Sequence, residues 1–326
     1  MNRSVSRSVT VLCGGVGAAR FMRALAGVHP PADTTAIINT GDDTVLHGLA
    51  ISPDIDTVTY TLAGAIDPER GWGLSGESWR AMDALQRYAE LKPMGSSAAP
   101  TWFNLGDKDL ATHLYRTARR AEGASLTEVT AEIAAAWGLG QLLLPMTDAV
   151  VTTMVSLREE GIEVPFQEYF VQRRHSVPVD AVRFAGAAEA SLTVSARSAL
   201  ADSDVIVIAP SNPLVSIGPI RGLADVDALL AARRDSVVAI SPIIGGVALK
   251  GPADQMLLEL GHEPSALGVA RLYTEIAGTL IIDPVDEALV PAIEAAGMRA
   301  VVTPSVMSEP DVGPELARRT LAAARR

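Results

Sequence analysis

Short runs of β-forming residues alternate with helical patterns along most of the chain. The runs predicted as strands are "SVTVLC" (8–13), "TTAIINT" (34–40), "DVIVIAP" (204–210), "SVVAISPI" (236–243), "TLIIDP" (279–284) and "RAVVTP" (299–304). A helical pattern lies near each run, and repeated strand–helix units imply a parallel sheet with helices on both faces. We therefore predict an α/β protein with a Rossmann-like, doubly wound and mainly parallel sheet.

Two stretches interrupt this alternation. Residues 77–140 have mostly helical patterns and are predicted to form a helical insertion. Residues 149–186 contain three segments expected to be extended, with a turn near Gly161, and are predicted as an extra β segment. The loop-like stretch "KPMGSSAAP" (92–100) is too short to link two domains. We expect a single domain over residues 1–326.

Composition excludes several classes of protein. The chain has 326 residues, is 48% hydrophobic and carries a formal charge of -11, whereas nucleic-acid binding needs basic surfaces. The sequence has no uninterrupted run of about eighteen apolar residues, the length that spans a membrane. The single cysteine, Cys13, rules out an intrachain disulfide and fits a reducing compartment. We expect a soluble cytoplasmic protein.

A glycine-rich turn, "CGGVGAAR", follows the first predicted strand. Gly14, Gly15 and Gly17 let the backbone approach a ligand, and the helix that follows favours an anion at its N-terminus. The third glycine of the dinucleotide fingerprint is missing, and no Gly-Lys-Ser/Thr of a Walker A loop follows. Contact with a phosphate and tight strand–helix packing both remain open for these glycines.

Aspartates gather after the second predicted strand. Asp42, Asp43, Asp54 and Asp56 lie within "GDDTVLHGLAISPDIDTVTY" (41–60), and carboxylates this dense repel one another unless a positive charge lies among them. Mg²⁺ prefers such oxygen ligands together with substrate phosphates. The alternative gives the first two aspartates to a turn and the last two to the N-terminal cap of a helix that runs to about Gly64. All four together favour a metal and phosphate site.

Two later strands end in loops suited to a nucleotide. "APSNPLVSIGPI" (209–220) and "SPIIGGVALKGPAD" (241–254) combine small polar residues, proline and glycine, and Lys250 supplies a cation for a phosphate. Such loops are also ordinary connectors. Because parallel α/β sheets bind ligands beyond the carboxyl ends of their strands, we expect both loops at the binding site.

The segment "WFNLGDKDLATHLYRT" (102–117) adds Asp107, Lys108, Asp109 and His113. One helical turn separates Asp109 from His113, so both side chains face the same way. A capped, solvated helix start explains the pattern equally well. His47 and His175 have no metal-ligand spacing, and Cys13 is expected to be a small buried residue.

These motifs resemble the 2-phospho-L-lactate transferase family (CofD, called FbiA in actinobacteria), which makes coenzyme F-420. The resemblance runs from about residue 8 to residue 320, and further segments that carry it are "DPERGWG" and "FQEYFV". It implies transfer of a phosphorylated three-carbon acid from its guanosine diphosphate ester to the deazaflavin Fo, with release of GMP. It also implies a requirement for Mg²⁺ and a homodimer.

The resemblance also implies roles for individual residues. Asp43 and Asp54 would be the metal carboxylates, with Asp42 and Asp56 as alternatives, and one of the four would take the hydroxyl proton of Fo. Gly14, Gly15 and Gly17 would lie along the diphosphate. The residues expected to hold guanosine diphosphate are Ser211, Asn212, Pro213, Ser241, Gly245, Gly246 and Lys250. Those expected near Fo are Trp72, Asp107, Lys108 and Asp109.

Two other classes of protein compete with the transferase. A related bacterial group resembles nucleotide-sugar-binding regulators, and its pattern lacks the "HGL.ISPDIDT" and "GDKDLATH" segments found here. A nicotinamide dehydrogenase is disfavoured by the broken glycine fingerprint. The acid stays open among phospholactate, phosphoenolpyruvate and 3-phosphoglycerate, and "LLLPMTDAVVTTMV" (142–155) is the segment expected to select it.

Overall fold

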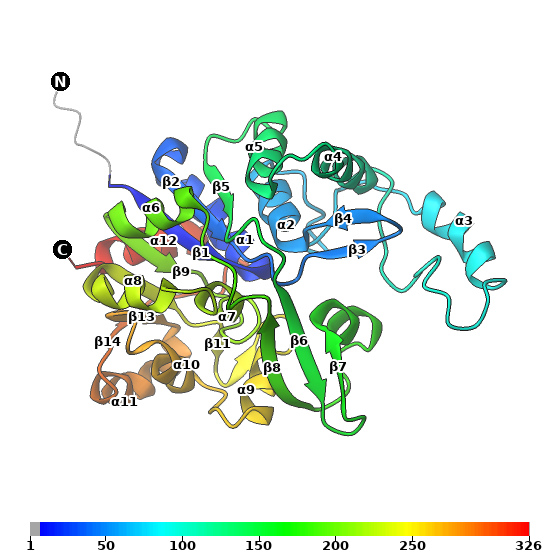
Figure 1. The fold of residues 1–326 in the computed structure, drawn as a ribbon. Helices are drawn as coiled ribbons and strands as arrows, with labels where there is room; N and C mark the ends of the chain where they lie inside the picture. Colours follow the sequence, from blue (N-terminus) through cyan, green and yellow to red (C-terminus); the bar gives the residue numbers. More distant parts are fainter. Residues whose placement is uncertain (1–6, 326) are drawn as a thin grey trace.

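The computed structural model describes residues 7–325, and a parallel sheet lies at its centre (Figure 1). Within these residues the sheet has seven strands, in the spatial order β14 (Arg299–Val302), β13 (Thr279–Ile282), β10 (Val237–Ile240), β9 (Val205–Ile208), β1 (Val9–Cys13), β2 (Thr34–Ile38) and β5 (Leu142–Pro145). Every neighbouring pair is parallel. The chain winds outward from β1 to β5, returns to β9 beside β1, and winds outward again. The winding therefore reverses between β1 and β9, where doubly wound sheets bind ligands.

Helices cover both faces of this sheet, because its strands bury side chains on both sides. Val11 packs on one face with helices α1 (Gly15–Ala26), α2 (Pro53–Leu62), α5 (Leu126–Ala136) and α12 (Val312–Ala323). Leu12, the next residue, packs on the other face with α6 (Val194–Asp202), α7 (Gly218–Arg221), α8 (Val226–Ala232), α9 (Ala253–Glu259), α10 (Ala266–Tyr273) and α11 (Val290–Ala295). The predicted doubly wound α/β fold is confirmed.

The chain between β2 and β5 carries the first group of added elements. A short antiparallel hairpin, β3 (Thr44–Leu46) and β4 (Leu49–Ile51), precedes α2. Helices α3 (Arg80–Ala89), α4 (Asp109–Ala121) and α5 follow, and α3 lies far from the central sheet (Figure 1). Helix α2 begins after Ser52, with Pro53 in its first turn. The expectation that Asp54 or Asp56 caps this helix is wrong, since both lie inside its first turns.

The chain between β5 and β9 forms a smaller antiparallel sheet. Its strands lie in the order β7 (Ile162–Pro165), β6 (Thr152–Leu157) and β8 (Val179–Ala185). Residues 162–174 were expected to be extended throughout, but Glu168–Gln172 form a π-helical turn. Leu142–Pro145 were not predicted as a strand, because leucine has no strong preference for strands. A two-residue hairpin pair, β11 (Ile243–Ile244) and β12 (Val247–Ala248), follows β10.

Across residues 7–325, every helix is too short or too polar to span a bilayer.

Candidate active site

A cavity of about 500 Å³ opens where the winding of the sheet reverses. The predicted residues that line it are Gly14, Gly15, Gly17, Asp42, Asp54, Asp56, Trp72, Asp109, Ser211, Asn212, Ser241 and Lys250. The cavity therefore joins the glycine turn, the aspartate-rich segment, the loops after β9 and β10, and the start of α4. The predicted residues outside its lining are Asp43, Asp107, Lys108, Pro213, Gly245 and Gly246.

The glycine turn is packed tightly against the loop after β9. A Cβ atom on Gly17 would lie 2.1 Å from the carbonyl oxygen of Pro210, and one on Gly14 would lie 2.7 Å from Cβ of Ser216. Gly15 has a φ of +72°, and its N–H donates to Oδ1 of Asp54 at 2.8 Å. Close packing thus explains Gly14 and Gly17, and all three glycines also line the cavity.

Asp54 is held by the polypeptide without a cation. Besides the Gly15 N–H, its carboxylate accepts a hydrogen bond from Nδ2 of Asn39 at 3.0 Å. Oδ1 of Asn39 in turn accepts a hydrogen bond from the N–H of Gly41 at 2.8 Å. Asn39 therefore links Asp54 to the residue that directly precedes Asp42. Burial raises the pKa of Asp54 to about 6.

Asp42 is buried nearby and is equally without a cation. Its exposed fraction is 6%, and burial followed by the charge of Asp54 raises the pKa of its carboxyl well above the ordinary value. Over the described part of the chain, Oδ1 of Asp42 has no hydrogen-bond partner, and neither Asp42 nor Asp54 forms an ion pair. Burial makes the charged form of both carboxylates costly, and the charge of Asp54 adds to this cost for Asp42, so a cation bound between them would be stabilising.

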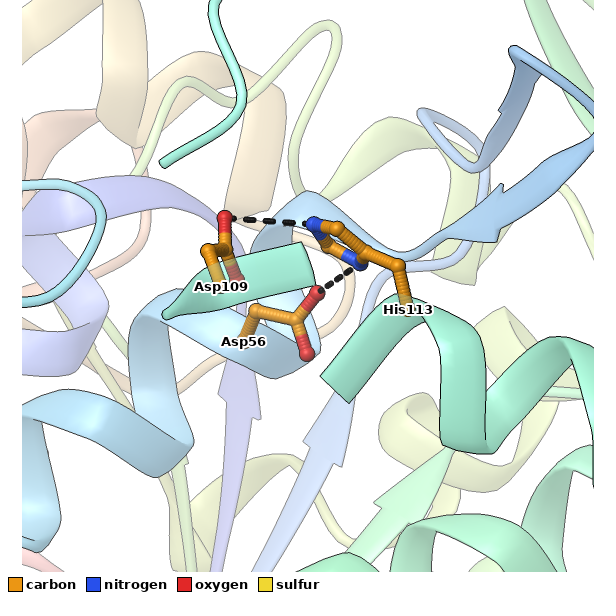
Figure 2. Close-up of side chains that lie close together, drawn as sticks. All are labelled: Asp56, Asp109 and His113. Atoms are coloured by element: carbon orange, nitrogen blue, oxygen red, sulfur yellow. Dashed lines mark ion pairs between the residues drawn. The ribbon is translucent and has the colours of Figure 1, made fainter. Parts of the chain in front are cut away.

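Asp56 and Asp109 differ, because Arg116 and His113 of α4 and Tyr60 of α2 lie against their carboxylates. The guanidinium of Arg116, which is 1% exposed, contacts both carboxylate oxygens of Asp56, with Nη1 at 3.1 Å from Oδ2. The ring of His113 lies between the two aspartates (Figure 2), with Nε2 at 3.1 Å from Oδ2 of Asp109 and Nδ1 at 3.7 Å from Oδ2 of Asp56. Tyr60 donates its hydroxyl to Oδ1 of Asp109 at 2.6 Å.

This cluster is also a geometric candidate for a metal site. Ligand atoms of Asp56, Asp109 and His113 all lie within 4.8 Å of one another. Arg116, however, already neutralises Asp56, and its Nη1 lies 3.3 Å from Nδ1 of His113. Burial would raise the pKa of Asp109, but the hydrogen bond and charge of His113 lower it overall. The pair of Asp42 and Asp54 therefore has the stronger need for a cation.

Asp43, expected to be a metal ligand, lies outside the cavity lining. Its Oδ2 accepts a hydrogen bond from the hydroxyl of Ser52 at 2.6 Å, and burial raises the pKa of its carboxyl to about 8. Adjacent residues of a loop direct their side chains differently, so Asp42 reaches the cavity and Asp43 does not.

Replacing Asp43 with Asn is expected to flatten part of the pH dependence of stability in the metal-free protein. Between the ordinary pKa of 3.8 and about 8, the unfolded chain has lost the Asp43 proton and the native state keeps it, so the free energy of unfolding of the parent falls as pH rises. The Asn variant has no such proton. Urea unfolding in EDTA across this range measures the difference, which should grow with pH in favour of the variant. Parallel pH profiles would contradict the burial of this carboxyl.

The remaining predicted residues lie at the edges of the site. Gly245 is held in the β11–β12 hairpin, where its N–H donates to the carboxylate of Asp286. Asp107 accepts from the hydroxyl of Ser78, and Nζ of Lys108 donates to the carbonyl of Ser75 at 2.8 Å. Asp107 and Lys108 thus hold the loop that carries Trp72, instead of lining the cavity.

Several cavity residues were missed from the sequence. Arg20 of α1 and Tyr60 of α2 line the cavity, as do Phe166 and Phe170, whose rings stack with centroids 5.5 Å apart. Arg20 lies three residues after Gly17, a spacing that places it on the cavity side of α1. Both phenylalanines lie in "FQEYFV", a segment that carries the family resemblance, but their place in the cavity was not predicted, because the segment was expected to be extended and contains a π-helical turn. Conversely, residues 142–155, expected to select the acid, contribute nothing to the lining.

Comparison with known proteins places the chain in a family. The family described as 2-phospho-L-lactate transferase CofD matches residues 9–308. Proteins named phosphoenolpyruvate transferase from Streptomyces griseus and Mycobacterium tuberculosis are each 40% identical to this chain. The alignment with the Streptomyces protein covers 96% of this chain and 97% of that protein. The alignment with the Mycobacterium protein covers 95% of this chain and 96% of that protein. A crystal structure of a UPF0052-family protein from Bacillus halodurans has a TM-score of 0.62 at 13% identity over 97% of this chain and 99% of that one, which supports the fold.

The fold, the cavity at the point where the winding of the sheet reverses, and these relatives together define an α/β enzyme of the transferase class. The chain belongs to the 2-phospho-L-lactate transferase CofD family, as its motifs indicated. Its role is phosphotransfer in the biosynthesis of coenzyme F-420.

Proposed function

We propose that the protein transfers a phosphorylated three-carbon acid from its guanosine diphosphate ester to the terminal hydroxyl of Fo, with release of GMP. The observation that supports this most directly is a pair of buried carboxylates, Asp42 and Asp54, that form no ion pair within residues 7–325 and lie beside the glycine turn in the cavity. For the acid we propose phosphoenolpyruvate, the one named in the Streptomyces and Mycobacterium relatives.

The nucleotide is proposed to lie on the strand-end side of the cavity. Ser211 and Asn212 follow β9, and Ser241 follows β10, so their polar groups meet where the winding reverses. Arg20 and Lys250 are cations in the same lining and face the charge of a diphosphate. The proposed role of Gly245, Gly246 and Pro213 is to shape these loops, since none of the three lines the cavity.

Fo is proposed to lie on the side built by the segments between β2 and β5. Trp72, which is 42% exposed, offers a ring surface to a flat deazaflavin. Asp109 also lines the cavity, and its carboxylate has about four lone-pair positions, of which the hydrogen bond from Tyr60 uses one. We therefore propose Asp109 as the acceptor of the hydrogen bond from the ribityl hydroxyl. Arg116 and His113 hold this part of the site in place.

A divalent cation fits the residues present. Asp42 and Asp54 offer the hard oxygen ligands that Mg²⁺ prefers, and Oδ1 of Asp42 is buried without a partner. When bound, Mg²⁺ supplies positive charge to phosphate oxygens as charge develops on them. Asn39 orients Asp54, and the Gly15 N–H fixes its other oxygen, so the chain presets the carboxylate.

Removal of the metal is expected to abolish turnover. With EDTA in excess, the rate of GMP release should fall to the background rate, because phosphoryl transfer relies on positioning and charge stabilisation. Added Mg²⁺ should restore it, and added Na⁺ at matched ionic strength is the control. Full activity in chelator would exclude a metal at Asp42 and Asp54.

The proposed reaction is tested by mass spectrometry of products. Fo is incubated with the guanosine diphosphate esters of phosphoenolpyruvate, phospholactate and 3-phosphoglycerate in turn, and we expect the phosphoenolpyruvate adduct of Fo together with GMP. An adduct with a different acid would show that phosphoenolpyruvate is the wrong donor group, but it would still support the proposed type of reaction. Binding of UDP-sugars with no adduct from any ester would instead favour a nucleotide-sugar-binding regulator.

The remaining proposals on assembly and location follow the family resemblance. We propose a homodimer that acts in the cytoplasm, and analytical ultracentrifugation of the purified protein tests the dimer. A monomer at micromolar concentration would contradict it.

A further inference from the structure

Three segments meet at one side of the cavity, and Lys250 joins them. Its Nζ donates to the backbone carbonyl of Arg70 at 3.2 Å, in the loop between α2 and α3. A Cβ atom on Gly71 would lie 2.9 Å from that Nζ and 3.3 Å from Cγ1 of Val16 in the glycine turn. The loop after α2 therefore rests directly on the glycine turn and on the segment after β10.

The loop held by Lys250 carries Trp72 and is tied together by contacts of Arg70. The guanidinium of Arg70 lies 5.2 Å from the ring of Trp72 and 5.1 Å from that of Trp79, and it forms an ion pair with Asp67 at 3.2 Å. Nη2 of Arg70 also donates to the carbonyl of Leu74 at 3.0 Å. Displacing the backbone of Arg70 therefore displaces the ring of Trp72 in the cavity.

Lys250 has donors to spare for an anion. An ammonium group has three N–H donors, and within residues 7–325 its one hydrogen bond goes to Arg70. No carboxylate of those residues lies within 4.0 Å of its Nζ. Lys250 and Arg20 both line the cavity, and partial burial followed by the charge of Arg20 lowers the pKa of Lys250. The negative charge of a diphosphate on the glycine turn would offset both unfavourable effects.

We propose that Lys250 couples the two substrate sites, by bridging the diphosphate of the donor to the Arg70 carbonyl and so fixing the loop that presents Trp72 to the acceptor. The inference rests on the proposed function. It predicts that guanosine diphosphate and Fo raise each other's affinity by the same factor, because coupling between two binding sites is reciprocal.

Lys108, which precedes α4, provides a matched control because it bonds to the same loop. Its Nζ donates to the carbonyl of Ser75 at 2.8 Å, a lysine–carbonyl bond of the kind that Lys250 makes, but Lys108 does not line the cavity. Replacing Lys108 with Met loosens the loop without removing a contact to the diphosphate. Comparing the Lys108 and Lys250 variants therefore distinguishes the effect of loosening the loop from the effect of uncoupling it from the donor.

The test is calorimetric titration of Fo into the parent, Lys250→Met and Lys108→Met, with GDP absent or saturating for each variant. For the parent we expect GDP to lower the Kd of Fo about fivefold or more, within the range typical of coupled sites. Lys250→Met should bring the ratio of the two Kd values near one. Lys108→Met should weaken Fo binding equally with and without GDP and keep the parental ratio. Lys250→Arg should retain most of the coupling.

Retention of the parental ratio in Lys250→Met, or its equal loss in Lys108→Met, would overturn the inference. A parent that binds both ligands independently would overturn it too, while leaving the transferase proposal intact. A parent that binds neither GDP nor Fo would instead remove the proposed function. Titrating GDP with and without Fo gives the same ratio by reciprocity, and matching thermal melts establish that the variants are folded.

Discussion

Replacing Asp42 or Asp54 with Asn should lower the rate of transfer about a hundredfold or more, the size of effect seen when one preorganised electrostatic group is removed. Each 1.36 kcal/mol lost from transition-state stabilisation is a factor of about ten in rate. The substitution keeps the size of the side chain and removes the charge that would hold Mg²⁺. Steady-state release of GMP measures the rate.

Asp43→Asn is the matched control, because it makes the same change at a neighbouring carboxylate outside the cavity. It should keep most of the parental rate and the full requirement for Mg²⁺. Binding to the native state alone raises the melting temperature, so Mg²⁺ should stabilise the parent and Asp43→Asn more than the Asp42 and Asp54 variants. If Asp43→Asn lost activity and metal response while Asp42→Asn kept both, the metal site would have to move to Asp43.

Arg116→Met is expected to destabilise the protein by about 3–5 kcal/mol, because it leaves the buried carboxylate of Asp56 without its cation. Asp56 is 4% exposed and Arg116 is 1% exposed, so water replaces little of the lost interaction. Urea unfolding at neutral pH measures the change. The double variant Arg116→Met with Asp56→Asn should recover much of the stability, since removing both partners of a buried pair is often close to neutral.

Arg119→Met serves as the control on the same helix. Arg119 pairs with Glu122 and Glu132 near the surface, and such pairs contribute little. We expect its unfolding midpoint to stay close to that of the parent. A loss no larger for Arg116→Met than for Arg119→Met would show that Asp56 does not need its buried partner.

The strands of the central sheet were predictable where their residues are β-branched. β1, β9, β10 and β13 are buried along their whole length, and a strand covered on both faces is a continuous apolar run in the sequence. β5 was missed because a run of leucines suits a helix as well as a strand. The π-helical turn after β7 was missed because it is a local departure that no sequence period signals.

The segments that form the site were predictable, but the contacts between individual side chains were not. Parallel strands bring their carboxyl ends to one edge, so the glycine turn, the aspartates and the two later loops were expected together. Which aspartate has a cation was not predictable, because Arg116 lies 60 residues from Asp56 in the chain. Thr153 illustrates the same limit: its segment was expected in the cavity, yet its N–H donates to the Gly41 carbonyl at 2.7 Å and the residue does not line the cavity.

The central sheet and the added segments contribute to the cavity in different ways. Strand ends supply Ser211, Asn212 and Ser241, whereas Trp72, Phe103 and Phe166 come from the chain inserted before and after β5. An insertion or exchange in those segments changes the second wall of the cavity and leaves every strand pairing of the sheet in place. The wall that faces the acceptor can therefore change shape without disturbing the sheet, whereas Ser211, Asn212 and Ser241 keep their places for as long as β9 and β10 are paired.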